Sequence, residues 1–206
     1  MIVGIPGYGR HPDWDEPSIE DWYSFILGYN EPNQPDQADI PPRKAAEEWI
    51  LLQEKYPDKL LVSPATGHAD TEWFDAFWEA CQELGCRIDY LATHMYDGDA
   101  DLVMETLEAY SKRYGNKKIW FTEFAKKCTH SEEEIVAFIE DLLPRLEAAP
   151  FVFRYAWWYT RYYPGPVDEE TNPWFWLDPV NSLLEDEASV LTAVGRAYDF
   201  PYHLYV

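Results

Sequence analysis

The amino-acid sequence predicts an α/β fold with a parallel sheet, of the (β/α)8-barrel type. Short apolar runs alternate along the chain with longer segments of helical periodicity. The connections between successive runs are long enough for the helical crossovers that parallel strands require. Polar and charged residues follow the predicted strands, at the end where a (β/α)8 barrel builds its active site. No glycine-rich phosphate loop follows any predicted strand, which disfavours a nucleotide-binding doubly wound fold.

The first half of the chain contains predicted strands and helices with clear local signals. Two prolines open a helix that runs from Pro41 to about Tyr56, because proline is favoured at the first helical position. Bulky apolar side chains of Thr71–Leu84 fall on one helical stripe, and Gly85 ends that helix. The predicted strands are the apolar runs Met1–Ile5, Ser24–Tyr29 and Lys59–Pro64.

The same alternation continues through the second half of the chain. Ser131 and Glu134 form a capping-box pattern before a helix, in which Pro144 predicts a kink or a break. Two further helices are expected over Asp101–Tyr114 and Glu187–Tyr198. The predicted strands are Ile88–His94, Lys118–Glu123 and Val152–Trp158.

Composition narrows the classes of partner. The chain has 206 residues with 47% hydrophobic content, which fits one globular domain over residues 1–206. Its formal net charge of -22 repels phosphate backbones and anionic lipid surfaces, so we expect neither nucleic-acid nor membrane partners. Ten tryptophans and fifteen tyrosines indicate a groove whose rings stack on flat apolar ligand faces, such as those of sugars.

The sequence has few cysteines and no recognisable targeting pattern. Three cysteines are too few for a disulfide scaffold, and Cys81 and Cys86, which frame a helix end, are consistent with simple core residues. No spacing of potential ligands resembles a metal site, so neither a metal nor an organic cofactor is expected. The N-terminus shows no signal-peptide pattern, and no segment is long and apolar enough to span a membrane.

Two carboxylates carry the chemistry that the sequence suggests. Glu31 lies in the segment GYNEP and Glu123 in the segment WFTEFA, and each follows an apolar strand. A glutamate there is costly to bury unless it points into a polar cleft. Hydrolysis of a glycosidic bond needs a proton donor and a second carboxylate on the other side of the anomeric carbon. The alternative is that each glutamate caps the following loop or pairs with an arginine.

Five segments in order, GYNEP, THMY, WFTEFA, RYAWW and LLEDEASVLTAVGRAY, resemble glycoside hydrolase family 128. Known members of that family are retaining endo-β-1,3-glucanases on a clan A (β/α)8 barrel. The resemblance implies that Glu31 ends barrel strand four and is the acid/base, and that Glu123 ends strand seven and is the nucleophile. The catalytic carboxyl groups would then lie about 5–5.5 Å apart.

The resemblance also implies residues that bind the substrate, a β-glucan polysaccharide or oligosaccharide. Asn30 matches the clan's ligand to the sugar 2-hydroxyl, with an Asx turn as the alternative. His94 and Tyr96 match a His-x-Tyr motif in strand six that contacts the sugar or supports the nucleophile. Trp157 resembles the tryptophan platform under the sugar at the cleavage point, and Trp158 is a weaker candidate for the same cleft.

The chain departs from the family pattern at its start. If Glu31 ends strand four, the sequence holds about six of the eight barrel strands, so we expect an incomplete barrel. Trp174 and Trp176 either extend the cleft or form a local cluster that holds their loop down. By resemblance, we expect an extracellular or cell-wall location.

Three other interpretations remain open at the level of sequence. The first is a clan A hydrolase that acts on another β-glycan. The second is a carbohydrate-binding protein without activity. The third is a doubly wound domain without sugar chemistry, which a separation of Glu31 and Glu123 well beyond ~10 Å would support.

Overall fold

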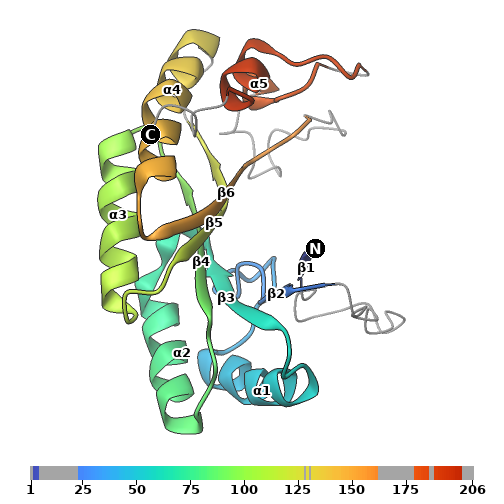
Figure 1. Ribbon diagram of the computed structural model, residues 1–206, viewed down its shortest axis with the longest axis vertical. Coiled ribbons are helices and arrows are strands. Elements are labelled where there is room, and N and C mark those ends of the chain that lie inside the picture. Colours follow the sequence, from blue (N-terminus) through green and yellow to red (C-terminus); the bar gives the residue numbers. More distant parts are fainter. Residues whose placement is uncertain are drawn as a thin grey trace.

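The computed structural model describes residues 2–4, 23–127, 129, 131–161, 179–185 and 188–200. Its strands form one six-stranded sheet in the order β1-β2-β3-β4-β5-β6, and every neighbouring pair is parallel (Figure 1). A strand order equal to the chain order is typical of a (β/α)8 barrel, whereas in a doubly wound sheet the order of the strands reverses at a switch point. The prediction of an incomplete barrel is therefore confirmed. The strands are β1 Ile2–Gly4, β2 Phe25–Leu27, β3 Leu60–Thr66, β4 Tyr90–Tyr96, β5 Ile119–Ala125 and β6 Val152–Trp157.

Helices connect the successive strands from β2 to β6, and α2, α3 and α4 lie along one face of the sheet (Figure 1). Two short 3-10 segments, η1 and η3, follow β3 and β6. No helix in the described part of the chain has both the length and the apolar character needed to cross a membrane. The elements are α1 Pro42–Lys55, η1 Gly67–Ala69, α2 Thr71–Leu84, α3 Ala100–Arg113, α4 Glu132–Ala148, η3 Pro179–Asn181 and α5 Ala193–Tyr198.

Side-chain caps fix where the helices α2, α3 and α4 begin. Asp70 caps α2 and Asp99 caps α3, and in each case the carboxylate accepts from the backbone amides two and three residues on. Ser131 accepts from the Glu134 amide at 3.2 Å, which is one half of the predicted capping box. The other half is absent, because the Glu134 carboxylate instead accepts a hydrogen bond from Thr129.

Two helices differ from the expected ones. Of the kink or break expected at Pro144, the break is absent, because helix α4 continues to Ala148 with buried leucines on both sides of the proline. The helix expected over Glu187–Tyr198 begins only at Ala193, because the Thr192 hydroxyl accepts from the Gly195 amide and caps it there.

The two faces of the sheet bury different side chains. On the helix-covered face, strand residues such as Leu61, Leu91 and Phe121 join one apolar core with the helices. On the other face, four aromatic rings cluster from Phe25, Tyr90, Trp120 and Phe153. The guanidinium of Arg154 lies 5.3 Å from the centre of the Trp120 ring and 5.2 Å from that of Phe153, which is a favourable cation–π arrangement.

Gly28 lets β2 approach β3 closely just before the first candidate carboxylate. A Cβ atom at this position would lie 2.6 Å from the backbone nitrogen of Pro64, so a larger residue would push the two strands apart. The Gly28 amide donates to the Val62 carbonyl at 2.9 Å, and the Glu31 amide donates to the Ala65 carbonyl at 2.8 Å. The segment that carries Glu31 is therefore held against the end of β3.

Cys81 and Cys86 form a disulfide across the end of α2, with their Cα atoms 4.8 Å apart. The expectation that they are simple core residues is therefore wrong. Gly85, in the left-handed conformation at φ 81, turns the chain after the helix and brings Cys86 back beside Cys81.

Candidate active site

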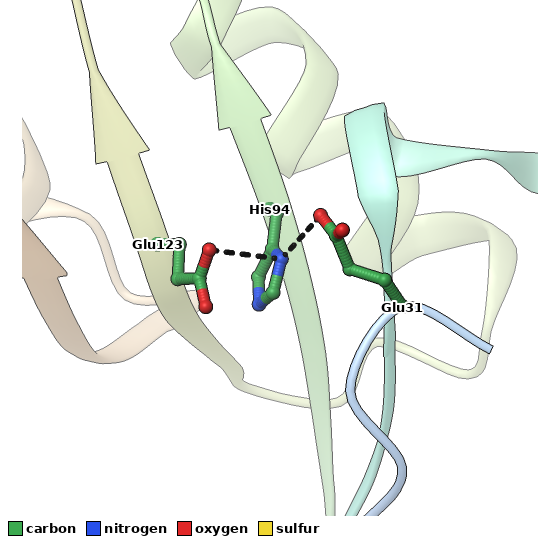
Figure 2. Close-up of side chains that lie close together, drawn as sticks. All are labelled: Glu31, His94 and Glu123. Carbon is green, nitrogen blue, oxygen red and sulfur yellow. Dashed lines mark hydrogen bonds and ion pairs between the residues drawn. The ribbon is translucent and has the colours of Figure 1, made fainter. Parts of the chain in front are cut away.

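Three side chains from separate segments meet at the C-terminal end of the sheet. His94 comes from β4 and Glu123 from β5, and the two residues are paired in the parallel register. Glu31 reaches them from the segment after β2. Figure 2 shows the His94 ring between the two carboxylates, with Nδ1 2.9 Å from Glu31 Oε1 and 3.4 Å from Glu123 Oε2. The predicted convergence of Glu31, His94 and Glu123 is thus present.

The two carboxylates are close and well shielded from water. One oxygen from each carboxylate and one nitrogen of His94 all lie within 4.8 Å of one another. Glu31 is 7% exposed and His94 is 1% exposed. A buried acid beside a second carboxylate is the arrangement by which proteins divide the roles of proton donor and anion between two like groups.

Glu31 is held in an unusual backbone conformation. Its φ of 40° lies in the left-handed region, which costs about 1–3 kcal/mol for a residue other than glycine. Two backbone hydrogen bonds hold it there, from the Glu31 amide to Ala65 at 2.8 Å and from the Gln34 amide to the Glu31 carbonyl at 2.9 Å. Because this conformation differs from that of a strand, the carboxylate turns towards His94 rather than following the alternation of β2.

The surroundings of Glu123 shift the pKa of its carboxyl group. Burial raises its pKa, and the negative charge of Glu31 acts in the same direction. The positive charge of His94 and the hydroxyl of Tyr96 oppose this rise in pKa. Tyr96 donates its hydroxyl to Glu123 Oε2 at 2.5 Å, and burial together with that carboxylate raises the pKa of Tyr96, so it remains a donor. Tyr96 therefore stabilises the anionic form of Glu123.

A cavity of about 730 Å3 opens beside these groups. Asn30, His94 and Glu123 line one part of it, and the aromatic rings of Trp120 and Phe153 line another. Asn30 is exposed, and its amide donates to the Gln37 carboxamide at 3.3 Å. Gln37 is thus a residue beside the site that the sequence analysis missed, because a single glutamine in a loop carries no spacing signal.

The two tryptophans at the end of β6 have opposite environments. Trp157 is 5% exposed, packs against Phe124 and donates its indole N–H to the Asn181 carbonyl at 2.8 Å. Trp157, the expected platform under the sugar, is therefore largely buried, and its indole N–H already has a protein partner. Trp158 is 40% exposed and is the tryptophan of this pair that a ligand can reach. Trp174 and Trp176 lie outside the described residues.

The three central side chains offer two kinds of chemistry. In the described part of the chain they form a set of carboxylate and imidazole donors close enough to share a metal ion. Without a metal, two neighbouring carboxyl groups can act as a nucleophile and a proton donor on one bond placed between them. The hydrogen bond from Tyr96 favours the ionised form of Glu123.

The chain matches known families and structures over most of its length. A family model described as glycosyl hydrolase catalytic core matches residues 13–198. An endo-β-1,3-glucanase of glycoside hydrolase family 128 (subgroup II) from Sorangium cellulosum is 30% identical with a TM-score of 0.75, over 95% of this chain and 78% of that chain. No curated protein matches the chain.

Two further solved structures are similar. A family 128 (subgroup II) endo-β-1,3-glucanase from Pseudomonas viridiflava is 33% identical with a TM-score of 0.69, over 86% of this chain and 70% of that chain. A mutant of a subgroup I endo-β-1,3-glucanase from Amycolatopsis mediterranei, in complex with laminaritriose and laminaribiose, is 25% identical. Its TM-score is 0.69, over 85% of this chain and 71% of that chain.

The raised pKa of Glu123 predicts a pH-dependent cost to stability. A carboxyl group whose pKa is higher in the folded state favours folding while protonated, and this contribution is lost as pH rises from the unfolded pKa to the folded one. Glu123→Gln should therefore gain stability relative to the wild type across that interval, by about 1.4 kcal/mol for each unit of raised pKa. Urea unfolding of both proteins at a series of pH values measures this difference.

Glu133→Gln provides a control of opposite sign. Hydrogen bonds from its own backbone amide and from Ser131 lower the pKa of Glu133, so the wild type should gain stability relative to this variant as pH rises. A stability difference between wild type and Glu123→Gln that does not change with pH would contradict the assignment of a raised pKa to Glu123.

Proposed function

Because the chain belongs to the glycosyl hydrolase catalytic core family, with a catalytic domain like those of glycoside hydrolase family 128, we propose that it hydrolyses β-1,3-glucan internally and with retention. In this proposal Glu31 is the acid/base and Glu123 is the nucleophile. The family assignment makes the chain a glycoside hydrolase, and the geometry of the site supports the finer assignment.

The observation that carries the proposal is the short separation of the two carboxylates. Retaining glycosidases place their catalytic carboxyl groups about 5–5.5 Å apart, whereas inverting enzymes need roughly 6.5–9.5 Å to admit a water molecule. Here one oxygen of Glu31 and one of Glu123 lie within 4.8 Å of each other. That spacing leaves no room for an attacking water between them and favours direct attack by a carboxylate.

In the first step, ionised Glu123 attacks the anomeric carbon and forms a bond to it. The bond from that carbon to the leaving glucan oxygen breaks, and the proton of Glu31 passes to the leaving oxygen. The hydroxyl of Tyr96 favours the ionised form of Glu123 before the attack. The opposing effect of burial confines this activity to pH values above the raised pKa of Glu123.

In the second step, Glu31 acts in the opposite direction. With its proton gone, Glu31 removes a proton from a water molecule, which attacks the anomeric carbon and releases Glu123. The sugar then keeps its original configuration, because two inversions have occurred at one carbon. His94 Nδ1 lies 2.9 Å from an oxygen of Glu31 and 3.4 Å from an oxygen of Glu123, so this ring nitrogen is placed beside both carboxylates in each step.

The proposed substrate follows from the similar structures and from the exposed groups of the site. The similar enzymes are endo-β-1,3-glucanases, and one holds laminari-oligosaccharides. The carboxamide of Asn30 is exposed beside Glu31 and lines the cavity, where it is suited to donate to a sugar hydroxyl. The exposed ring of Trp158 offers an apolar face on which a sugar can stack.

The disulfide supports a proposal about location. Disulfide bonds persist in oxidising compartments and are rare in the cytosol of most organisms. The Cys81–Cys86 bond is therefore consistent with a protein that works outside the cytosol, where glucan polymers are found.

Substrate choice provides the main test of the proposed function. Purified chain should release reducing sugar from laminarin, a β-1,3-glucan, and not from carboxymethylcellulose, a β-1,4-glucan. Glu123→Gln should abolish this release because it removes the nucleophile, and Glu31→Gln should lower it by roughly 10²–10⁴-fold. The anomer formed first, observed by proton NMR, should be the β form.

Each other result of this experiment supports a different interpretation. Release from carboxymethylcellulose alone would indicate another β-glycan specificity. Binding of laminarin without release, unchanged in Glu123→Gln, would indicate a carbohydrate-binding protein. Release of the α-anomer would contradict the retaining mechanism while leaving the substrate assignment intact.

Trp157, the last residue of β6, and Trp158, which follows it, should respond differently to truncation. Trp157→Ala empties a core position and should lower the free energy of unfolding by about 3–5 kcal/mol. Trp158→Ala should leave stability nearly unchanged and raise KM for laminarihexaose, because it removes an exposed ring. Chemical unfolding and steady-state kinetics of both variants check this contrast, and equal losses of stability would contradict it.

The proposed location can be tested on protein taken directly from its native cells. Free thiols are alkylated at lysis, the sample is reduced, and newly released thiols receive a second label. Peptides that contain Cys81 and Cys86 should carry the second label. If both peptides carry the first label in freshly lysed cells, the protein resides in a reducing compartment.

A further inference from the structure

We propose that Asn33 is a positioning residue that holds the Glu31 carboxylate in place through the loop Gly67–Asp70. The inference rests on the proposed function, because it assigns Asn33 a part in the proton transfer by Glu31. Asn33 lies two residues after Glu31 and contacts neither His94 nor Glu123 in any hydrogen bond of the described structure.

The carboxamide of Asn33 binds the loop at both of its ends. Its Oδ1 accepts from the Gly67 amide at 3.0 Å, and its Nδ2 donates to Asp70 Oδ2 at 3.1 Å. The same Nδ2 lies 3.5 Å from the Gly67 carbonyl. One side chain therefore ties the segment that carries Glu31 to the loop that follows β3.

Asp70 connects this clamp to a rigid element. While its Oδ2 accepts from Asn33, its Oδ1 accepts from the amides of Glu72 at 2.9 Å and Trp73 at 3.4 Å. These are two of the four free amides at the N-terminus of the 14-residue helix α2. The position of Asn33 is thus fixed against the N-terminus of α2.

The backbone of Gly67 lies against the Glu31 carboxylate, so the position of Gly67 limits where that carboxylate can lie. A Cβ atom at Gly67 would lie 3.0 Å from Glu31 Oε1, so the backbone of this glycine forms a wall against that oxygen. The same Oε1 is the atom that His94 Nδ1 approaches to 2.9 Å. A shift of Gly67 would therefore change where the carboxylate can rest, relative to His94 and to the bond that it protonates.

Both segments that the clamp joins are strained. Glu31 has φ 40°, and on the other side of the clamp His68 and Ala69 have φ 57° and 51°. Residues of these types persist in the left-handed region only when their surroundings hold them there. Asn33 supplies such a restraint between Glu31 and His68, which explains why a polar side chain distant from the reacting atoms is built into this position.

Two substrates whose leaving groups differ in their need for a proton can distinguish this positioning role of Asn33 from a general structural role. A sugar leaving group needs the proton of Glu31, whereas 2,4-dinitrophenolate leaves without it. The first substrate is laminarihexaose and the second is 2,4-dinitrophenyl β-laminaribioside. Glu31→Gln, which removes the acid, should slow the bond-cleaving step for laminarihexaose but not for the dinitrophenyl substrate. For the dinitrophenyl substrate, the pre-steady-state release of dinitrophenolate measures that step.

Asn33→Asp is the sharpest single change because it keeps the size and the acceptor for the Gly67 amide. It replaces the amide donor with a second carboxylate beside Asp70, so the two groups repel. We expect kcat/KM for laminarihexaose to fall roughly tenfold or more, since misplacement by about 1 Å can cost ~10²-fold. The burst of dinitrophenolate should change less than about threefold, because a general acid contributes little to such a leaving group.

The double variant Asn33→Asp/Asp70→Asn reverses the direction of the hydrogen bond. The new amide at position 70 can donate to the new carboxylate at position 33, which still accepts from the Gly67 amide, and the helix cap is kept. Activity on laminarihexaose should return to within about threefold of the wild type if the clamp is what matters. Asp99→Asn is the matched control, since Asp99 caps the 14-residue helix α3 in the same way and has no bond to Asn33.

The outcomes are distinct. Equal loss on both substrates in a folded Asn33→Asp protein, or a double variant that stays inactive, would overturn the inference while the proposed function stands. If Asn33→Asp does not fold, Asp70→Asn alone breaks the same hydrogen bond and carries the same comparison. A wild-type chain that cleaves neither substrate would refute the proposed function and this inference together.

Discussion

The rest of the site depends on the way that one imidazole is shared between two largely buried carboxylates. Two such groups within 4.8 Å of each other repel when both are ionised, and burial removes the water that would screen them. His94 Nδ1 lies within hydrogen-bond reach of Glu31 and close to Glu123, so either charge finds a partner. The strand register that pairs His94 with Glu123 makes this arrangement a property of the sheet itself.

Much of the fold and part of the site could be predicted from the sequence. Apolar runs and helical stripes place nearly every element, and the polar residues after the runs identify Glu31, His94 and Glu123, because parallel strands bring their C-terminal ends together. Trp157 and Trp158 show where this reasoning fails. The register shifts between β5 and β6 at two places, so the alternation along β6 no longer tells which tryptophan faces the core.

The role of the loop Gly67–Asp70 after β3 could not be predicted from the sequence either. It depends on Gly67, which leaves room for the Glu31 carboxylate, on Asp70, which caps α2, and on an asparagine from the segment after β2 that binds the loop backbone. Each of these residues is ordinary by itself in a loop, and only their placement around Glu31 gives them a common purpose. The Cys81–Cys86 disulfide depends in the same way on the turn made by Gly85, which a count of cysteines does not reveal.

The agreement between strand order and chain order has a consequence for biosynthesis. Each of the strands β2 to β6 pairs with the strand made just before it, so these neighbours can pair in the order in which they emerge from the ribosome. Glu31, His94 and Glu123 emerge in that order on successive parts of the same growing sheet. The glutamate assigned the attacking role is the last of the three to be made, so the reactive pair is complete only after β5 has followed β4.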